Sequence, residues 1–481
     1  ELQRVVTTND IIWIRFEQLD IEKDRKEKSA EISNSALAGK YYDFIGLVDL
    51  VTPTVVMGNS SGSISISGQC LSKVLTDDEA IFFPLSVLQD SFSGNLLIGP
   101  SNNNRLISRL FSSGQFHTKF AHSFRNIKET LSFYINQLSN MGVLPETRNS
   151  DFFESYGDRR TKMYAIKGEE VQSPFQRGIY QIIKLEIDEA IQNRTVVDAS
   201  VSNPQGSLMS LFYKVCQPPL VEFFFDTYRD TFSMVVRKPP FDSKSIQDWL
   251  NRGNQDLYVV EEGNISQENL FFENNFYTWF QIYNNGVFLG MDKQVALTYV
   301  PIVSLPEYVD LWGSKPLSVT SNYTVTNTTV TEKDKEQVIQ DLIYLIESNA
   351  YLPFTRRGTI VLNKGDRRIK KGSYIEYERT GEVFYVEAVI NSASISGNQV
   401  NRSTVLQVSR GMIKRFVDKS STVLVYEGEE INYFNLVNLE NLKSTLKEFM
   451  IKNKGKSLMK AVLVNKEVFN FFLSKKQFGG W

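Results

Sequence analysis

The segment Gly58-Asn59-Ser60-Ser61-Gly62 has the residue types and spacing of a turn that carries a serine nucleophile. Its G-x-S-x-G pattern needs a buried strand before the serine and a helix directly after it, because that geometry exposes a strained side chain. Here residues 63–67 alternate strictly between serine and isoleucine, which predicts a strand instead. We therefore interpret the segment as the loop of a β-hairpin.

A second group with catalytic potential consists of Glu222, Asp226 and Asp230. Two carboxylates on either side of a sugar bond are what a glycosidase requires. Acidic residues are also common in hairpin turns, where Asp bonds to the neighbouring backbone. Because these three lie in and around a predicted hairpin, we favour the structural interpretation, and a cell-wall glycosidase is the enzymatic alternative.

Phosphate and metal chemistry have weaker support. Gly455-Lys456-Ser457 resembles the end of a phosphate-binding loop, but the upstream glycine that such a loop needs is replaced by Met450. His117 and His122 are the only histidines, and a spacing of five does not place two side chains on one helix face. We predict no catalytic residue, no metal site and no cofactor-binding residue.

The remaining candidate residues also have ordinary explanations. Cys70 and Cys216 are the only cysteines, too few for a disulfide framework or a zinc site, and we expect small buried thiols. The pairs Arg159-Arg160 and Arg356-Arg357 would suit acidic neighbours across an interface, although a solvated face is the simpler expectation. Several Asn-x-Ser/Thr triplets occur, including those at Asn193, Asn322 and Asn327, and they carry no weight without a secretion signal.

The composition of the chain limits the number of domains and the classes of partner. The 481 residues are 42% hydrophobic and 12% aromatic, which is typical of three or four globular domains. The net charge of −2 is a poor basis for tight binding to nucleic acid, because phosphate binding needs a basic surface. We find no signal peptide and no apolar run long enough to cross a bilayer. Since the chain begins at Glu1, a trimmed chain and a piece of a longer one both stay open.

The residues from 10 to 219 predict a β-rich start followed by helices. Residues 10–17 and the apolar run 44–50 predict strands, the latter broken at Thr52 and Pro53. The alternating strand is expected to bury one face and to end at Gly68, with a short helix after it. Helical periodicity follows over 102–141, in a helix from Phe175 to about Asn193, and in a shorter one over 206–215.

The residues from 220 onward predict two more β-rich parts separated by a helix. Residues 221–225 and 232–237 predict a hairpin with a turn at 226–229, and residues 257–261, 276–283 and 294–303 predict strands. Residues 318–331 read as a loop, after which a capping box opens a helix whose apolar stripes include Val338, Leu342 and Leu345. Residues 359–410 are again rich in strand patterns. A helix is expected over 436–451, followed by a basic patch and an aromatic end.

Two stretches together resemble one family. The first reads I-G-L-V-D, a loop, then S-I-S-I-S-G-x-x-L-x-K-x-L, and it looks like the first barrel of phage tail hub proteins. The second resembles that family's closing barrel strands, with matches at Gly358, Gly365, Asp366, Ile369, Gly372, Phe384-Tyr385-Val386-Glu387, Leu406, Val408, Arg410 and Gly411. The family includes late-control-D and T4-type baseplate hubs and the N-terminal parts of type VI secretion spikes.

The resemblance implies an α+β fold with two tube-like antiparallel β-barrel domains, inserted helical segments and a C-terminal extension. The expected division is a first barrel over 1–100, a helical insertion over 101–219, a β-rich part of the second barrel over 220–330, a helix with closing strands over 331–411, and a docking extension over 412–481. It also implies a non-enzymatic homotrimer in the virion tail, assembled in the host cytoplasm. Its expected partners are the tail tube protein and a tail tip or spike protein, with DNA passing through without tight binding.

Three other functions stay open. A spike base of a contractile or type VI-like system would continue into a repeating needle, and no short repeats follow Gly411. A hub-associated glycosidase would need a carboxylate pair in a cleft. A receptor-binding module would use the aromatic end, for which Phe478 and Trp481 are the candidates.

Overall fold

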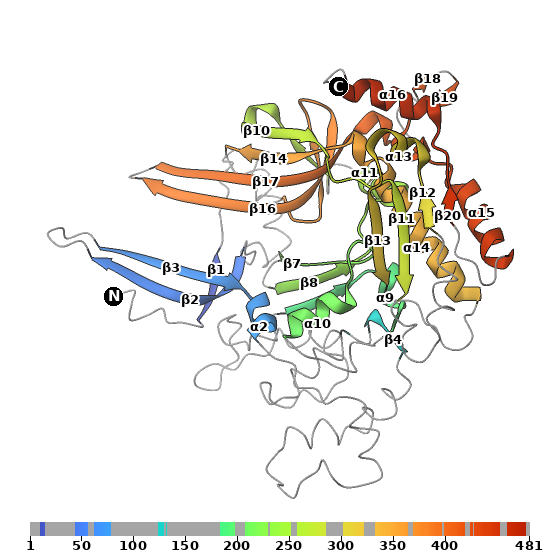
Figure 1. The fold of residues 1–481 in the computed structure, drawn as a ribbon. Coiled ribbons are helices and arrows are strands. Elements are labelled where there is room, and N and C mark those ends of the chain that lie inside the picture. Colours follow the sequence, from blue (N-terminus) through green and yellow to red (C-terminus); the bar gives the residue numbers. More distant parts are fainter. Residues whose placement is uncertain are drawn as a thin grey trace, which may run out of the picture. The chain divides into compact units, whose positions relative to one another are not determined.

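The computed structural model describes residues 10–14, 44–55, 62–77, 124–128, 131, 183–197, 207–228, 231–251, 257–284, 302–321, 332–363, 369–396, 399–418, 424–426, 428–452 and 459–477. The chain divides into two compact units, Glu1–Lys238 and Pro239–Trp481. Each unit combines helices with mainly antiparallel strands (Figure 1), so the α+β class is confirmed. The two tube-like barrels and the five-part division stay predictions.

A three-stranded antiparallel sheet begins unit 1. It consists of β1 (Ile11–Ile14), β2 (Phe44–Val55) and β3 (Gly62–Cys70), followed by helix α2 (Ser72–Asp77). The expected breaks at Pro53 and Gly68 are wrong, because Pro53 pairs with Ile64 and Gly68 pairs with Val48. Proline is tolerated there because β1 pairs with β2 only over Phe44–Leu47, which leaves Pro53 on an edge. Gly68 permits close approach, since a Cβ atom would lie 2.2 Å from the Leu47 carbonyl oxygen.

The rest of unit 1 is built on the predicted hairpin. Strands β7 (Glu222–Tyr228) and β8 (Thr231–Arg237) pair antiparallel, and β5 (Ile183–Ile187) joins β8 in parallel. The expected turn at 226–229 is wrong, because Asp226 pairs with Ser233 and the strand continues to Tyr228. Helix α10 (Leu208–Val215), capped by Ser207, confirms the short helix predicted there. Further elements are β4 (Phe124–Asn126), α9 (Glu189–Gln192) and β6 (Thr195–Val197).

The helix expected from Phe175 to Asn193 is wrong in its described part. Residues 183–187 form strand β5, and only the four residues of α9 are helical. Apolar Ile183, Leu185 and Ile187 alternate with charged side chains, which suits a strand once β8 is beside it. The pairing partner β8 lies about 50 residues later in the chain. Tertiary contacts therefore decided that residues 183–187 form a strand and not a helix.

A six-stranded sheet with its own apolar core forms the centre of unit 2. Its strand order is β10-β14-β17-β16-β15-β9. The strands are β9 (Tyr258–Val260), β10 (Ile265–Phe272), β14 (Arg356–Leu362), β15 (Tyr374–Tyr377), β16 (Glu382–Ser396) and β17 (Gln399–Ile413). The core includes Ile360, Ile375, Phe384, Leu406 and Val408. The outermost strands, β9 and β10, are joined by the short η5 (Glu262–Asn264), so the sheet must curl back on itself (Figure 1).

The strands predicted for 359–410 are confirmed, as are those near 257–261 and 276–283. A second sheet of unit 2 has the order β13-β11-β12-β20. Its strands are β11 (Trp279–Asn284), β12 (Ile302–Ser304), β13 (Pro316–Ser321) and β20 (Met459–Ala461). Strand β13 occupies the start of the segment expected to be a loop, residues 318–331. A parallel partner, β11, stabilises it there.

The helices of unit 2 include the one predicted from the capping box. Helix α14 (Glu332–Ala350) buries Val338, Ile339, Leu342 and Leu345 as expected. The other helices are α11 (Ser243–Asn251), α13 (Pro306–Trp312), α15 (Leu439–Lys452) and α16 (Lys466–Gln477). Short elements are η7 (Leu352–Phe354), η8 (Lys414–Phe416), β18 (Val425–Tyr426), β19 (Glu429–Glu430) and η9 (Tyr433–Leu436).

The aromatic end of the chain supplies part of the core of unit 2. On α16, Phe472 is fully buried and stacks on Tyr433 with ring centroids 4.3 Å apart. Phe469 is also buried and packs against Tyr308 at 5.4 Å. Residues Phe478 and Trp481, the candidates for receptor contact, lie outside the described residues. The described part of the expected docking extension is therefore largely internal packing.

Candidate functional site

The catalytic candidates are not assembled into one site among the described residues. Ser60, Ser61, His117, His122, Asp230, Arg159-Arg160 and Gly455-Lys456-Ser457 lie outside that part of the chain. The segment after Gly58-Asn59-Ser60-Ser61-Gly62 is strand β3, as predicted, and not the helix that a nucleophile turn requires. In the described residues, no group of three or more His, Cys, Asp and Glu side chains is placed to hold a metal ion.

Glu222 and Asp226 occupy one strand and do not form a glycosidase pair. They are four positions apart on β7, which separates them by roughly 13 Å at the usual rise of a strand. Inverting and retaining glycosidases need separations below about 9.5 Å. Glu222 is instead engaged by Arg237, its cross-strand partner, in an ion pair.

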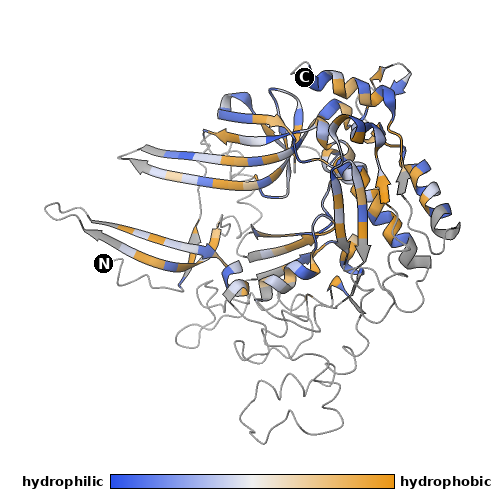
Figure 2. Ribbon diagram, viewed as in Figure 1, coloured by the Kyte–Doolittle hydropathy of each residue, from blue (hydrophilic) through white to orange (hydrophobic). Residues whose placement is uncertain are grey.

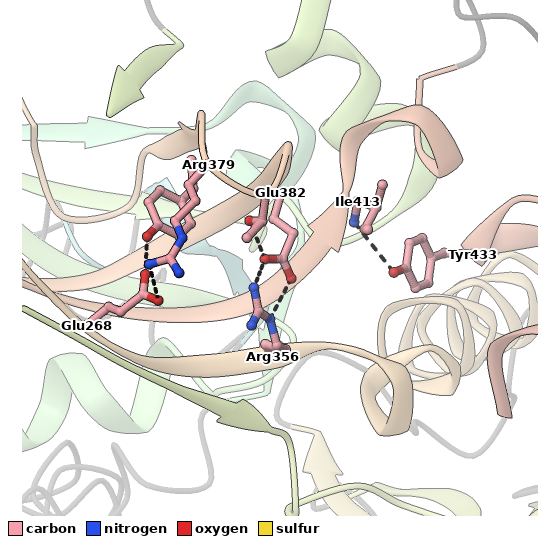
Figure 3. Close-up of polar contacts among 8 residues, drawn as sticks. Glu268, Arg356, Arg379, Glu382, Ile413 and Tyr433 are labelled. Carbon is pink, nitrogen blue, oxygen red and sulfur yellow. Dashed lines mark hydrogen bonds and ion pairs between the residues drawn. The ribbon is translucent and has the colours of Figure 1, made fainter. Parts of the chain in front are cut away.

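A buried ion pair ties the base of the curled sheet together. Arg356 on β14 donates from Nε to Glu382 Oε1 at 2.8 Å and also bonds the second carboxylate oxygen, and Thr380 donates to Glu382 at 2.6 Å (Figure 3). Glu382 is fully buried. Burial lowers the pKa of Arg356, but its bonds and charge attraction to Glu382 outweigh that effect, so its pKa is raised. Arg356 thus finds its acidic neighbour inside the subunit.

A second polar group links the two ends of the curled sheet. Tyr377, on β15, donates its hydroxyl to Glu268 on β10, and Arg379 reaches the same carboxylate at 2.9 Å (Figure 3). Burial first, and then the bond to Glu268, raise the pKa of Tyr377 to about 12. These contacts close the sheet where no backbone ladder joins β10 to β15. These contacts therefore stabilise the fold, and the Glu268 carboxylate is engaged by both Tyr377 and Arg379.

The cysteines have structural environments. Cys216 is fully buried, and burial raises the pKa of its thiol. Cys70 is half-buried with its Sγ 2.7 Å from the Ser72 hydroxyl. The expectation of small buried thiols is confirmed for Cys216 and only partly for Cys70.

The hairpin of β16 and β17 carries a long open strand edge. β15 pairs with β16 only over Glu382–Tyr385, and backbone bonds to Gly372 and Ser373 extend this cover to Val386. From Glu387 to Ser396, β16 has only β17 as a neighbour among the described strands. The opposite edge opens too, because β14 pairs with β17 no further than Thr404. The hairpin thus runs on beyond β14 (Figure 1).

The hairpin of β2 and β3 is open in the same way. Within the described residues β3 pairs only with β2, and β2 pairs with β1 only as far as Leu47. The strict Ser–Ile alternation was expected to bury one face. Instead Ile64 and Ile66 are each more than a third exposed, and Leu50 is 57% exposed. Figure 2 shows the ribbon of this pair mostly in white and orange, the colours of intermediate and hydrophobic residues.

Two of the open edges lack the charges that normally protect a free strand, since residues 388–396 of β16 and all of β3 contain no charged side chain. The other open stretches are less bare, because Glu387 begins the open part of β16, and Arg402 and Asp49 lie on the opposite strands β17 and β2. Exposed edges present unpaired backbone groups, and monomeric proteins usually guard them with Lys, proline or a covering element. Within the described residues, each of these two edges is therefore a candidate for pairing with another strand. We define two candidate functional sites, one in each unit: the projecting part of β2–β3 in unit 1 and that of β16–β17 in unit 2.

Sequence reasoning located the strands of both hairpins but missed these sites. The available signal was the run of small and β-branched residues without charge at 388–396. Its meaning depended on knowing where the neighbouring strands stop.

We compared the chain with protein families, with curated sequences and with solved structures. No family model matches the chain, and no curated protein sequence matches it. Its fold is similar to the crystal structure of the prophage MuSo2 43 kDa tail protein from Shewanella oneidensis. The two share 11% sequence identity with a TM-score of 0.35, over 77% of this chain and 78% of that chain. No described helix is both long and apolar enough to cross a membrane.

Proposed function

We propose that this chain is a structural tail hub protein of a bacteriophage. Three copies form a ring that adapts the sixfold tail tube to the threefold tail tip, with DNA passing through its channel. The ring resides in the virion tail after assembly in the host cytoplasm. The proposal includes a non-enzymatic role, with the tail tube protein above and a tip or spike protein below.

The open, uncharged edges of the two hairpins are the observation that carries this proposal. A ring removes such edges, because each hairpin pairs with a strand of the next subunit. One hairpin lies in each unit, so three chains would contribute six of them, which suits a tube of sixfold symmetry. The motif matches at the base of β14, β16 and β17 are consistent with the same role.

The described residues after Gly411 belong to the fold of unit 2. Here α16 packs Phe469 and Phe472 into unit 2, and β20 pairs with β12. The described part after Gly411 is therefore engaged in the unit itself.

Mass measurement of the purified chain tests the ring directly. We expect three copies per particle, alone or after addition of the tail tube protein. The double substitution Ser392→Lys and Ser394→Lys places charge on the exposed part of β16 and should abolish assembly without unfolding. Ser474→Lys, at an exposed serine of α16, is the matched control and should assemble normally.

A stable monomer under every condition, or assembly unaffected by the double substitution, would contradict the ring. Incubation with purified peptidoglycan tests the non-enzymatic part. We expect no released fragments, and turnover that is lost in Asp230→Asn would establish the glycosidase instead.

A further inference from the structure

Two lysines from distant parts of unit 2 meet over one aromatic cluster. Lys476, on the last turn of α16, has its Nζ 5.5 Å from the ring centroid of Phe272, 5.7 Å from that of Phe276 and 5.6 Å from that of Trp312. Lys315, just after α13, has its Nζ 3.9 Å from the centroid of Phe276. Two ammonium groups therefore share one ring.

The backbone holds this pair in place. Lys315 exchanges two hydrogen bonds with Thr278, one from its own N–H to the Thr278 hydroxyl and one from the Thr278 N–H to its carbonyl, each 2.8 Å long. Lys476 donates from Nζ to the Pro353 carbonyl at 2.7 Å. Thr278 is fully buried. The backbone of Lys315 is thus anchored to a buried residue, and the side chain of Lys476 is held against η7.

No carboxylate neutralises the pair among the described residues. Neither Lys315 nor Lys476 takes part in an ion pair in that part of the chain. Burial lowers the pKa of Lys476, and the charge of Lys315 lowers it further. Like charges repel, and an anion that contacts both ammonium groups would relieve the repulsion.

We propose that Lys315 and Lys476 bind a carboxylate of an acidic segment of a partner protein. The aromatic rings that each ammonium group contacts exclude water from part of its surroundings, which strengthens a charge-assisted hydrogen bond. The site lies in unit 2 and is independent of the hairpin edges.

Ring geometry favours a protein carboxylate over nucleic acid. Binding to single strands uses free aromatic faces on which bases stack. Trp312 instead packs edge-on against Phe276 at 4.9 Å and Tyr308 at 5.0 Å, so its ring is engaged internally. Two cations on a chain of net charge −2 also release few counterions.

Fluorescence anisotropy with the full chain tests the site. The probe is a labelled short peptide that alternates glutamate and leucine, and a labelled oligothymidylate of equal length serves as the competing class. Lys315→Met and Lys476→Met should each weaken peptide binding by at least about tenfold, the usual effect of losing a charged hydrogen bond. Lys476→Arg keeps the charge and should retain most of the affinity.

Lys475→Met is the matched control, because Lys475 is the adjacent residue of α16 and its Nζ lies over a different ring, that of Phe471, at 5.7 Å. It should bind the peptide as the wild type does. The peptide should also raise the Tm of the wild type and leave the Tm of the Lys315→Met, Lys476→Met double variant unchanged. Equal losses in Lys475→Met, no peptide binding by the wild type, or tighter binding of the oligothymidylate would overturn the proposal.

Discussion

The two strands of the β16–β17 hairpin pair with each other along its whole length, but the neighbours of its base differ from those of its projecting end. At the base, β16 lies between β15 and β17, and its side chains enter the core and the Arg356–Glu382 pair. At the projecting end, the same strands pair only with each other, and Ile390 is 51% exposed. The base is stabilised by its own unit, whereas within the described residues the projecting end has no neighbouring strand outside the hairpin. In the ring that we propose, a neighbouring subunit would cover this end.

The largest contrast is expected between core and projecting apolar residues. Phe384→Ala should lower the free energy of unfolding by about 3–5 kcal/mol, because the ring is fully buried at the base. Ile390→Ala should change it by no more than about 0.5 kcal/mol in the isolated chain. Urea unfolding of both variants checks this. Similar costs at the two positions would show that the projecting end is packed inside the subunit.

Breaking the buried ion pair should have the next largest effect. Glu382→Gln leaves Arg356 half-buried without its counter-charge, so we expect a loss of about 3 kcal/mol. Glu387→Gln is the control, because Glu387 is exposed on the same strand just beyond the base and accepts a bond from Ser409. Its loss should stay below about 1.5 kcal/mol by the same unfolding measurement. An equal loss in both variants would refute the difference between base and projection.

A smaller effect is expected where β10 closes on β14. Gly358 has φ +151°, and a Cβ atom would lie 1.9 Å from the Asn269 carbonyl oxygen, so Gly358→Ala should cost about 1–3 kcal/mol. Gly263, in the turn between β9 and β10, has nothing within 4 Å of its Cβ position. Gly263→Ala should therefore stay within about 0.5 kcal/mol in thermal melts. A cost at Gly263 would place the strain in the turn instead.

The smallest effect concerns alkaline pH. The pKa of Tyr377 is about 12 in the folded chain, against about 10 when unfolded, so the unfolded state loses its proton first. Stability from this group is complete below pH 10 and falls as pH rises toward 12. Tyr377→Phe should flatten that decline in urea unfolding at pH 9, 10 and 11. Tyr213→Phe, at a tyrosine that is 53% exposed, should leave it unchanged.

Much of the fold followed from local patterns. The hairpin after Leu220, helix α14 with its buried stripes, and the strands of residues 359–410 were all predicted, because apolar periodicity reports which face of an element is buried. The candidate functional sites could not be predicted in the same way. The strand over residues 63–67 was expected to have a buried face, but burial requires a neighbouring segment, and periodicity does not show which segment that is.

The sequence by itself determined where helices α14 and α15 and the strands within residues 359–410 lie, and that no charged run protects residues 388–396. The tertiary structure alone decided where those strands end, that 183–187 pairs with β8 as a strand, and that Phe469 and Phe472 belong to the core of unit 2. The physical reason is the distance along the chain over which each kind of interaction acts. Backbone preference and side-chain period act over a few residues, whereas strand ends and burial depend on segments that meet only after the chain has folded.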